Sequence, residues 1–182
     1  MRLTRVYVPG AHRPHEQVEL PSGASDHLVR VLRLRPGAEL QLFNGEGRRW
    51  HGRLTALRGR RVTVSVGDAL PTEPKPRLQV VLLQSLLRTD KMDWVVQKTT
   101  ELGVSAIYPV LAAHTVVRAD TEQLARKVTH WRGIAIAACE QSGRAWLPCI
   151  APPCDLESAC RRLQDSGAIV WALEASAPRS LA

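Results

Sequence analysis

A short proline-rich segment divides this chain into two halves with different residue patterns. The segment Gly67 to Arg77, GDALPTEPKPR, carries three prolines and no hydrophobic periodicity, which is typical of a stiff linker. Short strand-like stretches precede it, whereas strand-like and helix-like stretches alternate after it. We therefore predict a first domain at residues 1–70, a linker at 71–77 and a second domain at 78–182.

The first half has the pattern of a small β-barrel. Its apolar stretches are short, rich in β-branched residues and separated by turn signals such as Arg35-Pro36-Gly37. Ser25 can cap one short helix, in which Leu28, Val31 and Leu32 share a face. The predicted strands are Arg2 to Val8, Ala38 to Phe43, Arg48 to Leu57 and Arg61 to Val66. This spacing predicts a barrel with one short helix.

The second half has the pattern of an α/β domain with a mostly parallel sheet. The predicted strands are Leu78 to Gln84, Ser105 to Val110 and Ala168 to Leu173, and the first and third read as strands buried on both faces. The predicted helices are one capped by Asp90 and ended by Gly103, one over Thr121 to Ser142 ended by Gly143, and one over Asp155 to Gln164. The class expected for the whole chain is thus β plus α/β.

Positive charge is concentrated in the first half. Residues 1–77 hold 14 Lys and Arg against 7 Asp and Glu, whereas residues 78–182 hold 11 against 10. Arg supplies 21 of the 25 basic residues, which a coding bias can explain, but such a bias does not explain the asymmetry. A basic domain joined to a nearly neutral one indicates an anionic partner, and nucleic acid is the partner we expect.

Several classes of function lack sequence support. The N-terminus MRLTRVYVPG has no secretory apolar region and the apolar run Val80 to Leu87 is too short to cross a bilayer, so we expect a cytoplasmic protein without membrane contact. The four cysteines, at 139, 149, 154 and 160, lack metal-ligand spacing, so buried reduced thiols and no metal are expected. Motifs for dinucleotide binding, phosphate loops, serine hydrolysis and zinc proteolysis are absent. Three isolated histidines, His27, His51 and His130, are expected to be structural.

Two polar clusters are candidate sites in the second half. Arg88 and Lys91 lie where the first strand of the sheet meets a helix N-terminus, which is suited to phosphate. Lys98 and Glu101 share that helix, and an ordinary surface ion pair explains them equally well. The run Glu140-Gln141-Ser142-Gly143-Arg144 ends the long helix; it suits a base edge or phosphate, or Arg144 simply complements the helix dipole.

Motifs of one known family recur in order along the chain. They are Arg5-Val6-Tyr7-Val8, then His27 with Val31-Leu32-Arg33 and Gly37, then Phe43-Asn44-Gly45, then Lys91-Met92-Asp93 with Gln97-Lys98, Thr100-Glu101-Leu102-Gly103-Val104 and Pro109, and finally Glu140 to Arg144 with Pro148. Together they resemble the RsmE family of 16S ribosomal RNA uridine methyltransferases. The resemblance implies a PUA-like RNA-gripping barrel, a SPOUT-type α/β domain with a C-terminal trefoil knot, and a homodimer.

The resemblance also implies a reaction and a set of site residues. A methyl group passes from S-adenosylmethionine to N3 of a uridine in small-subunit rRNA, and the protein aligns the groups and helps to remove the N3 proton. Arg144 is the expected catalytic donor to charge developing on uracil, oriented by Glu101 or Glu140. The expected RNA-binding residues are Arg2, Arg5, His27, Arg30, Arg33, Arg48, Arg49, Arg88, Lys91 and Lys98.

The chain departs from the family pattern in two places. It has His114-Thr115-Val116 where family members commonly have Arg before Ser-Val. It also ends at Ala182, before the glycine-rich loop and later segment to which the resemblance assigns the knot and cofactor pocket. We therefore expect a C-terminally truncated SPOUT-type domain whose 182 residues bind S-adenosylmethionine very weakly and do not methylate RNA. The alternative is a non-catalytic RNA-binding or ribosome-assembly protein that has lost the cofactor loops.

Overall fold

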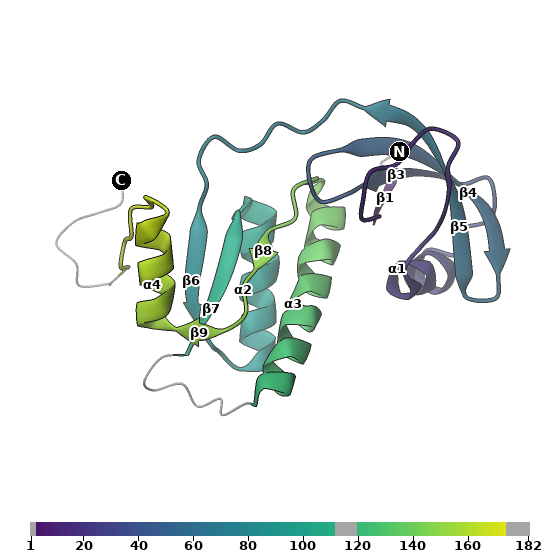
Figure 1. Cartoon of the computed structure of the whole chain (residues 1–182). Coiled ribbons are helices and arrows are strands. Elements are labelled where there is room, and N and C mark those ends of the chain that lie inside the picture. Colours follow the sequence, from purple (N-terminus) through teal and green to yellow (C-terminus); the bar gives the residue numbers. More distant parts are fainter. Residues whose placement is uncertain (1–2, 112–119, 174–182) are drawn as a thin grey trace.

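Two separate β-sheets organise the chain (Figure 1). The structure is a computed structural model that describes residues 3–111 and 120–173. The first sheet has five strands in the order β1-β3-β4-β5-β2. They are β1 (Thr4–Tyr7), β2 (Gln17–Glu19), β3 (Glu39–Phe43), β4 (Arg49–Arg58) and β5 (Arg61–Leu70). We call this sheet and its helices the N-terminal domain.

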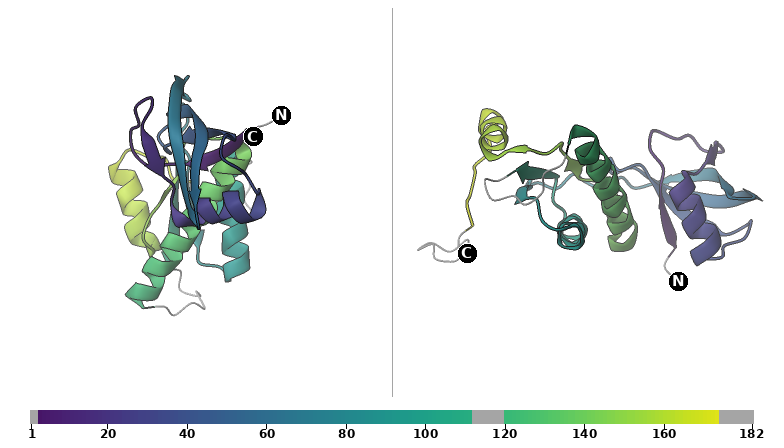
Figure 2. Two further views of the ribbon diagram at one scale, coloured as in Figure 1. Left: turned by 90° about the vertical axis from the view of Figure 1, so that its right-hand side faces the viewer. Right: turned by 90° about the horizontal axis from the view of Figure 1, so that it is seen from below.

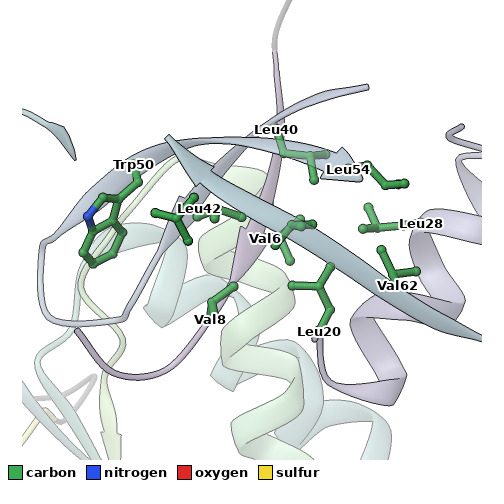
Figure 3. Close-up of a cluster of buried hydrophobic side chains, with 11 residues drawn as sticks. Val6, Val8, Leu20, Leu28, Leu40, Leu42, Trp50, Leu54 and Val62 are labelled. Atoms are coloured by element: carbon green, nitrogen blue, oxygen red, sulfur yellow. The ribbon is translucent and has the colours of Figure 1, made fainter. Parts of the chain in front are cut away.

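Two short helical turns cover the N-terminal sheet. They are α1 (Ser22–Asp26) and η1 (His27–Val31), a π-helical turn. The predicted cap at Ser25 is wrong, because Pro21 occupies the cap position and Ser25 lies buried within α1, where its hydroxyl donates to the carbonyl of Leu20. Leu28 enters a closed apolar core with Val6, Leu40 and Leu54 (Figure 3). Burial of these side chains orients η1 and leaves His27 and Arg30 exposed.

The N-terminal sheet is not closed by hydrogen bonds into the predicted full barrel. Within residues 3–111, β1 and β2 form its two edges and do not pair with each other. β1 pairs with β3 in parallel, and the other three pairs are antiparallel. The first half is thus a small, mostly antiparallel β domain, and the predicted closure into a barrel is not seen.

The second sheet has four strands that all run parallel. They are β6 (Val81–Ser85), β7 (Ala106–Leu111), β8 (Cys149–Ile150) and β9 (Cys154–Asp155), and each of the other three pairs with β7. The helices are α2 (Thr89–Leu102), α3 (Thr121–Ser142) and α4 (Leu156–Asp165). α2 and α3 pack on one face of the sheet and α4 lies on the other side (Figure 2). We call this unit the C-terminal domain.

The apolar stripe of α3 builds the core of the C-terminal domain. Trp131 and Ala135 are buried against Met92 and Val96 of α2 and Ile107 of β7. The bounds of α3 agree with the prediction, as does its end at Gly143. The predicted third helix is confirmed as α4, with Asp155 as its cap. The parallel α/β architecture is confirmed.

Three local predictions for this half are wrong. Residues 168–173 form no strand: the segment pairs with none of the described strands, and Ile169, Trp171 and Leu173 are 81%, 65% and 77% exposed. β6 begins later than predicted and is a half-buried edge strand. Asp90 lies in the first turn of α2 and the cap position is Arg88. Among the helices described, none combines the length and apolarity needed to span a bilayer.

Candidate functional site

Motif residues from both ends of the sequence meet where the two domains touch. Tyr7 of β1 donates its backbone N–H to Glu140 Oε1 at 3.1 Å, and Arg132 of α3 donates to the Tyr7 hydroxyl at 3.5 Å. Tyr7 also packs with Phe43 against Cys139 and Ala145 in a small core of its own. We call this region the interdomain joint.

Arg5 is half-buried in the interdomain joint. Its guanidinium donates to Gln41 Oε1 and to the carbonyl of Arg144, the latter at 2.8 Å. The same group lies 5.0 Å from the centre of the Phe43 ring, in a cation–π contact. Arg5, predicted to bind RNA, is thus engaged by the protein itself.

Burial perturbs two titratable groups of the joint. The pKa of Glu140 lies above its ordinary value because burial disfavours the charged carboxylate. The hydrogen bond from the Tyr7 N–H and the nearby side chains of His27 and Arg5 act in the opposite direction and lower the pKa of Glu140. Burial also raises the pKa of the Cys139 thiol to about 12, so this thiol stays protonated at neutral pH.

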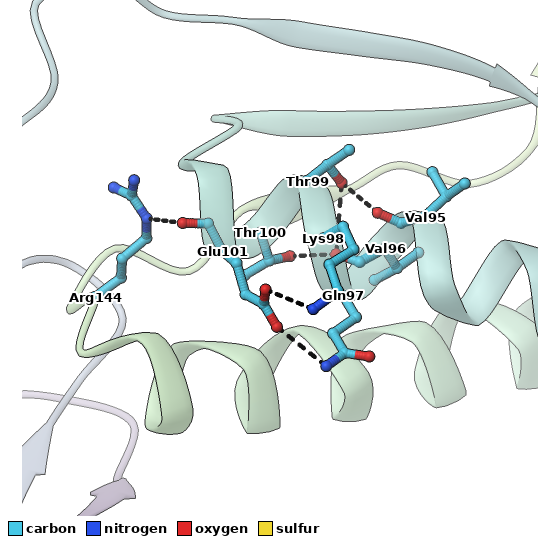
Figure 4. Close-up of polar contacts among 8 residues, drawn as sticks. All are labelled: Val95, Val96, Gln97, Lys98, Thr99, Thr100, Glu101 and Arg144. Atoms are coloured by element: carbon cyan, nitrogen blue, oxygen red, sulfur yellow. Dashed lines mark hydrogen bonds and ion pairs between the residues drawn. The ribbon is translucent and has the colours of Figure 1, made fainter.

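Arg144 closes the C-terminal end of α2 (Figure 4). Its Nε donates to the carbonyl of Glu101 at 2.8 Å. Gly103 makes this approach possible, since a Cβ there would lie 2.6 Å from Cζ of Arg144. The Glu101 carboxylate turns to Lys98 Nζ at 2.9 Å, and that hydrogen bond holds the pKa of Glu101 below its ordinary value. Arg144 and Glu101, two of the three predicted catalytic residues, are therefore engaged by other groups of the same chain.

Main-chain hydrogen bonds tie the domains together. Gly47 N–H donates to the carbonyl of Ala145 at 3.0 Å, and Leu147 N–H donates to the carbonyl of Gly45 at 2.9 Å. Glu73, from the predicted linker, accepts the Ala145 N–H at 2.7 Å through its carboxylate, and its carbonyl accepts the indole N–H of Trp146 at 2.9 Å. The linker is therefore part of the joint and not a free tether.

The predicted RNA-binding residues fall into exposed and engaged groups. Those whose side chains are exposed are His27, Arg30, Arg33, Arg48, Arg88 and Lys91. Arg49 donates to the carbonyl of Pro71, and Lys98 pairs with Glu101. Arg2 and His114 lie outside the described residues.

Arg144 and the predicted phosphate-binding residues lie at opposite ends of the parallel strands. We call the side of the sheet where the strands end the carboxyl edge, and the side where they begin the amino edge. Arg88 and Lys91 follow Ser85, the carboxyl end of β6, which is where α/β sheets hold ligands. Arg144 packs on Gly103, just before the amino end of β7. The structure therefore brings Arg144 and Glu101 together, with Glu140 bonded to Tyr7 instead, and places Arg144 away from the carboxyl edge.

Sequence reasoning missed Tyr7, Glu73 and Trp146, which build the joint. Their only signal was an aromatic residue beside a charged motif and an acid within the proline-rich segment. The prediction of buried thiols holds for Cys139 but not for Cys149, which is exposed at the start of β8. Within the described ranges, no group of three or more His, Cys, Asp or Glu is placed to hold a metal.

Comparisons with known families match both domains. Residues 21–67 match the family described as the RNA methyltransferase PUA domain, and residues 73–181 match the one described as the RNA methyltransferase domain. A Bacillus subtilis protein named ribosomal RNA small subunit methyltransferase E is 29% identical over 150 residues, which are 82% of this chain and 59% of that protein. The chain thus spans about three fifths of that relative.

Solved structures share the fold. The ribosomal RNA small subunit methyltransferase E of Neisseria gonorrhoeae, bound to S-adenosyl methionine, is 37% identical, with a TM-score of 0.81, over 87% of this chain and 65% of that one. A Legionella pneumophila protein solved with bound cofactor SAM is 33% identical, with a TM-score of 0.85, over 88% of this chain and 66% of that one.

Proposed function

We propose that this chain, which belongs to the RNA methyltransferase family, takes part in methyl transfer from S-adenosylmethionine to N3 of a uridine in 16S rRNA. The observation that carries the proposal is the ordered match of a PUA domain and a methyltransferase domain onto two sheets joined by a tight interface. The names of the relatives supply the small-subunit rRNA and the cofactor. A non-catalytic RNA-binding role is less well supported, since those relatives are named as methyltransferases.

The finer features of the proposal follow from the resemblance. They are a SPOUT-type C-terminal domain and a homodimer. The proposed cytoplasmic location and the domain limits at residues 1–70 and 78–182 follow instead from the residue patterns of the sequence. The all-parallel second sheet and the small, mostly antiparallel N-terminal domain agree with this arrangement. The joint supports a single working unit, because RNA gripped by one domain is presented to the other at a fixed position.

A cavity between the two domains, lined in part by Gly45 and Glu46 and by Ser105 and Cys149, does not fit the cofactor. Lys75 and Arg144 line it, and their positive charges repel the sulfonium and ammonium groups of S-adenosylmethionine. The cavity also lies at the amino edge of the sheet, whereas ligands of α/β sheets bind at the carboxyl edge. This cavity is therefore not the cofactor site.

The catalytic assignments of Arg144, Glu140 and Glu101 stay predictions from the resemblance. Their contacts support a positioning role, because Arg144 binds the carbonyl of Glu101 and Glu140 binds the backbone of Tyr7. Glu140 thereby holds β1 of the N-terminal domain against α3, whereas the contact between the Arg144 side chain and Glu101 lies within the C-terminal domain. The exposed side chains of Arg88 and Lys91 are better placed to meet RNA at the carboxyl edge.

Methyl transfer is tested on unmethylated 16S rRNA. The gene product at its full encoded length is incubated with methyl-labelled S-adenosylmethionine, and mass spectrometry of nuclease fragments locates the label. The expected result is a labelled methyl group on N3 of one uridine, as the proposed reaction requires. Label on another atom, or none, would contradict it. The 182-residue chain is assayed beside it to test the expectation that this chain alone is inactive.

Replacing Arg30 and Arg33 with alanine is expected to weaken RNA binding in a salt-dependent way. Both side chains are exposed beside η1, where they can reach phosphates. Each lost phosphate contact lowers the slope of log affinity against log salt by about 0.7 for single-stranded RNA. Fluorescence anisotropy with 16S rRNA fragments at several salt concentrations measures the slope. Arg161→Ala on α4, an exposed arginine paired with Glu157, is the control, and equal slopes in both variants would exclude the η1 surface.

A further inference from the structure

A cavity of about 280 Å³ lies between the two domains, away from the carboxyl edge of the sheet. Glu46 contributes from the turn after β3, Lys75 and Gln79 from the linker, and Ser105, Arg144 and Cys149 from the C-terminal domain. The volume is just below the range of about 300–1,000 Å³ typical of pockets for drug-sized ligands. The cavity therefore suits a small chemical group, such as a single phosphate of a polymer backbone.

The Arg144 guanidinium is only partly used by the protein. Its Nε is bonded to the carbonyl of Glu101, and its plane lies against Gly103. Neither Nη atom has a hydrogen-bond acceptor among residues 3–111 and 120–173. Because the packing on Gly103 fixes the guanidinium, its free N–H groups are held ready for an acceptor in the cavity.

The other polar groups favour an anion. Lys75 is exposed and forms no ion pair within the described parts of the chain. The Ser105 hydroxyl is likewise unbonded there, since only the main chain of Ser105 is used, to Val80 and Cys149. Glu46 is the one acid lining the cavity, and its carboxylate accepts from Asn44 at 3.4 Å. Two cations and a hydroxyl against one engaged carboxylate match the donor set that phosphate prefers.

We propose that this cavity binds a phosphate group of the RNA backbone as the strand passes from one domain to the other. The inference rests on the proposed function and deepens it, because it places a second anchor at the joint, distinct from the exposed arginines of η1. The cations and the hydroxyl that line the cavity belong to the matched RNA methyltransferase domain, and Gly45 and Glu46 of the matched PUA domain line its other side, so a phosphate bound there lies between the two domains. RNA bound there also reinforces the joint.

Cys149 provides a probe at the cavity. It is exposed, whereas Cys139 is buried with a pKa raised to about 12 and reacts little. Alkylation by N-ethylmaleimide is followed for each cysteine by peptide mass spectrometry, with and without a 16S rRNA oligonucleotide. We expect RNA to slow alkylation of Cys149 at least fivefold and to leave that of Cys160 on α4 unchanged. Lys75→Ala is expected to remove most of this protection and to lower the salt slope of RNA binding by about 0.7.

Arg77→Ala is the matched control, because Arg77 is exposed in the same linker and does not line the cavity. Equal behaviour of the Lys75 and Arg77 variants would overturn the proposal. If RNA bound, as measured by anisotropy, but did not protect Cys149 from alkylation, the cavity proposal would also be overturned. The proposed methyltransferase function would be unaffected by that result. Failure of the chain to bind RNA at all would count against the proposed function itself. If inorganic phosphate protected Cys149 as well as RNA does at the same concentration of phosphate groups, the cavity would be a site for free phosphate. The proposal that it binds RNA would then be overturned.

Discussion

Replacing Gly47 with alanine is expected to lower the free energy of unfolding by about 2–5 kcal/mol. Gly47 has a φ of +85°, where a side chain costs about 1–2 kcal/mol. Its Cβ would also lie 2.8 Å from the Glu73 carbonyl and from the Trp146 ring, and such overpacking adds about 1–3 kcal/mol. Urea unfolding followed by tryptophan fluorescence measures the loss.

Gly59→Ala separates the two contributions. Gly59 also has a positive φ, of +62°, but a Cβ there meets nothing within 4 Å. This variant is therefore expected to lose only the backbone part, about 1–2 kcal/mol. If both variants lost the same free energy, the close contact between Gly47 and the joint would not exist in solution. A larger loss at Gly47 assigns the difference to the interface between the domains.

Trp131→Ala is expected to destabilise the chain by about 3–5 kcal/mol, the cost of removing a buried aromatic side chain. Trp131 is 3% exposed and packs with Met92 and Val96 between α3 and α2. Because this contact holds the two helices on the sheet, its loss is also expected to weaken the attachment of α3 to the N-terminal domain. The free energy of unfolding in urea measures the first effect.

Trp94→Ala is the matched control, since Trp94 lies on α2 but is 61% exposed. Surface substitutions usually change stability by no more than about 0.5 kcal/mol. A loss at Trp94 as large as that at Trp131 would mean that Trp94 is covered in solution. That result would contradict the placement of α2 with this face towards solvent.

The elements best predicted from the sequence are those with local signals. The long helix has an apolar stripe and a glycine at its end, and its bounds were predicted correctly. The run Ala168 to Leu173 was predicted as a strand from apolar content alone, yet a strand also needs a partner, which periodicity cannot supply. Ser25 and Asp90 are good capping residue types, but neighbouring residues occupy the cap positions.

The sequence names candidate residues for the site, but it does not predict where in the fold these residues lie. Arg144 contacts Glu101 through the carbonyl of Glu101, whereas the contacts of Glu140 with Tyr7 and of Arg144 with Arg5 join residues more than 130 positions apart in the chain. No local pattern encodes such a contact. The cavity at the joint escaped prediction for the same reason, because its cations, Lys75 and Arg144, come from different segments.

The antiparallel bridge between Glu46 and Trp146 has a consequence for how a target is chosen. Because this main-chain pairing joins the two domains, the distance between the exposed arginines of η1 and the carboxyl edge of the parallel sheet is fixed. On the function proposed above, a nucleotide reaches the reaction edge only when it lies at a set contour distance from the gripped phosphate. The target uridine is then selected by its distance along the RNA from the bound phosphate, in addition to the identity of its base.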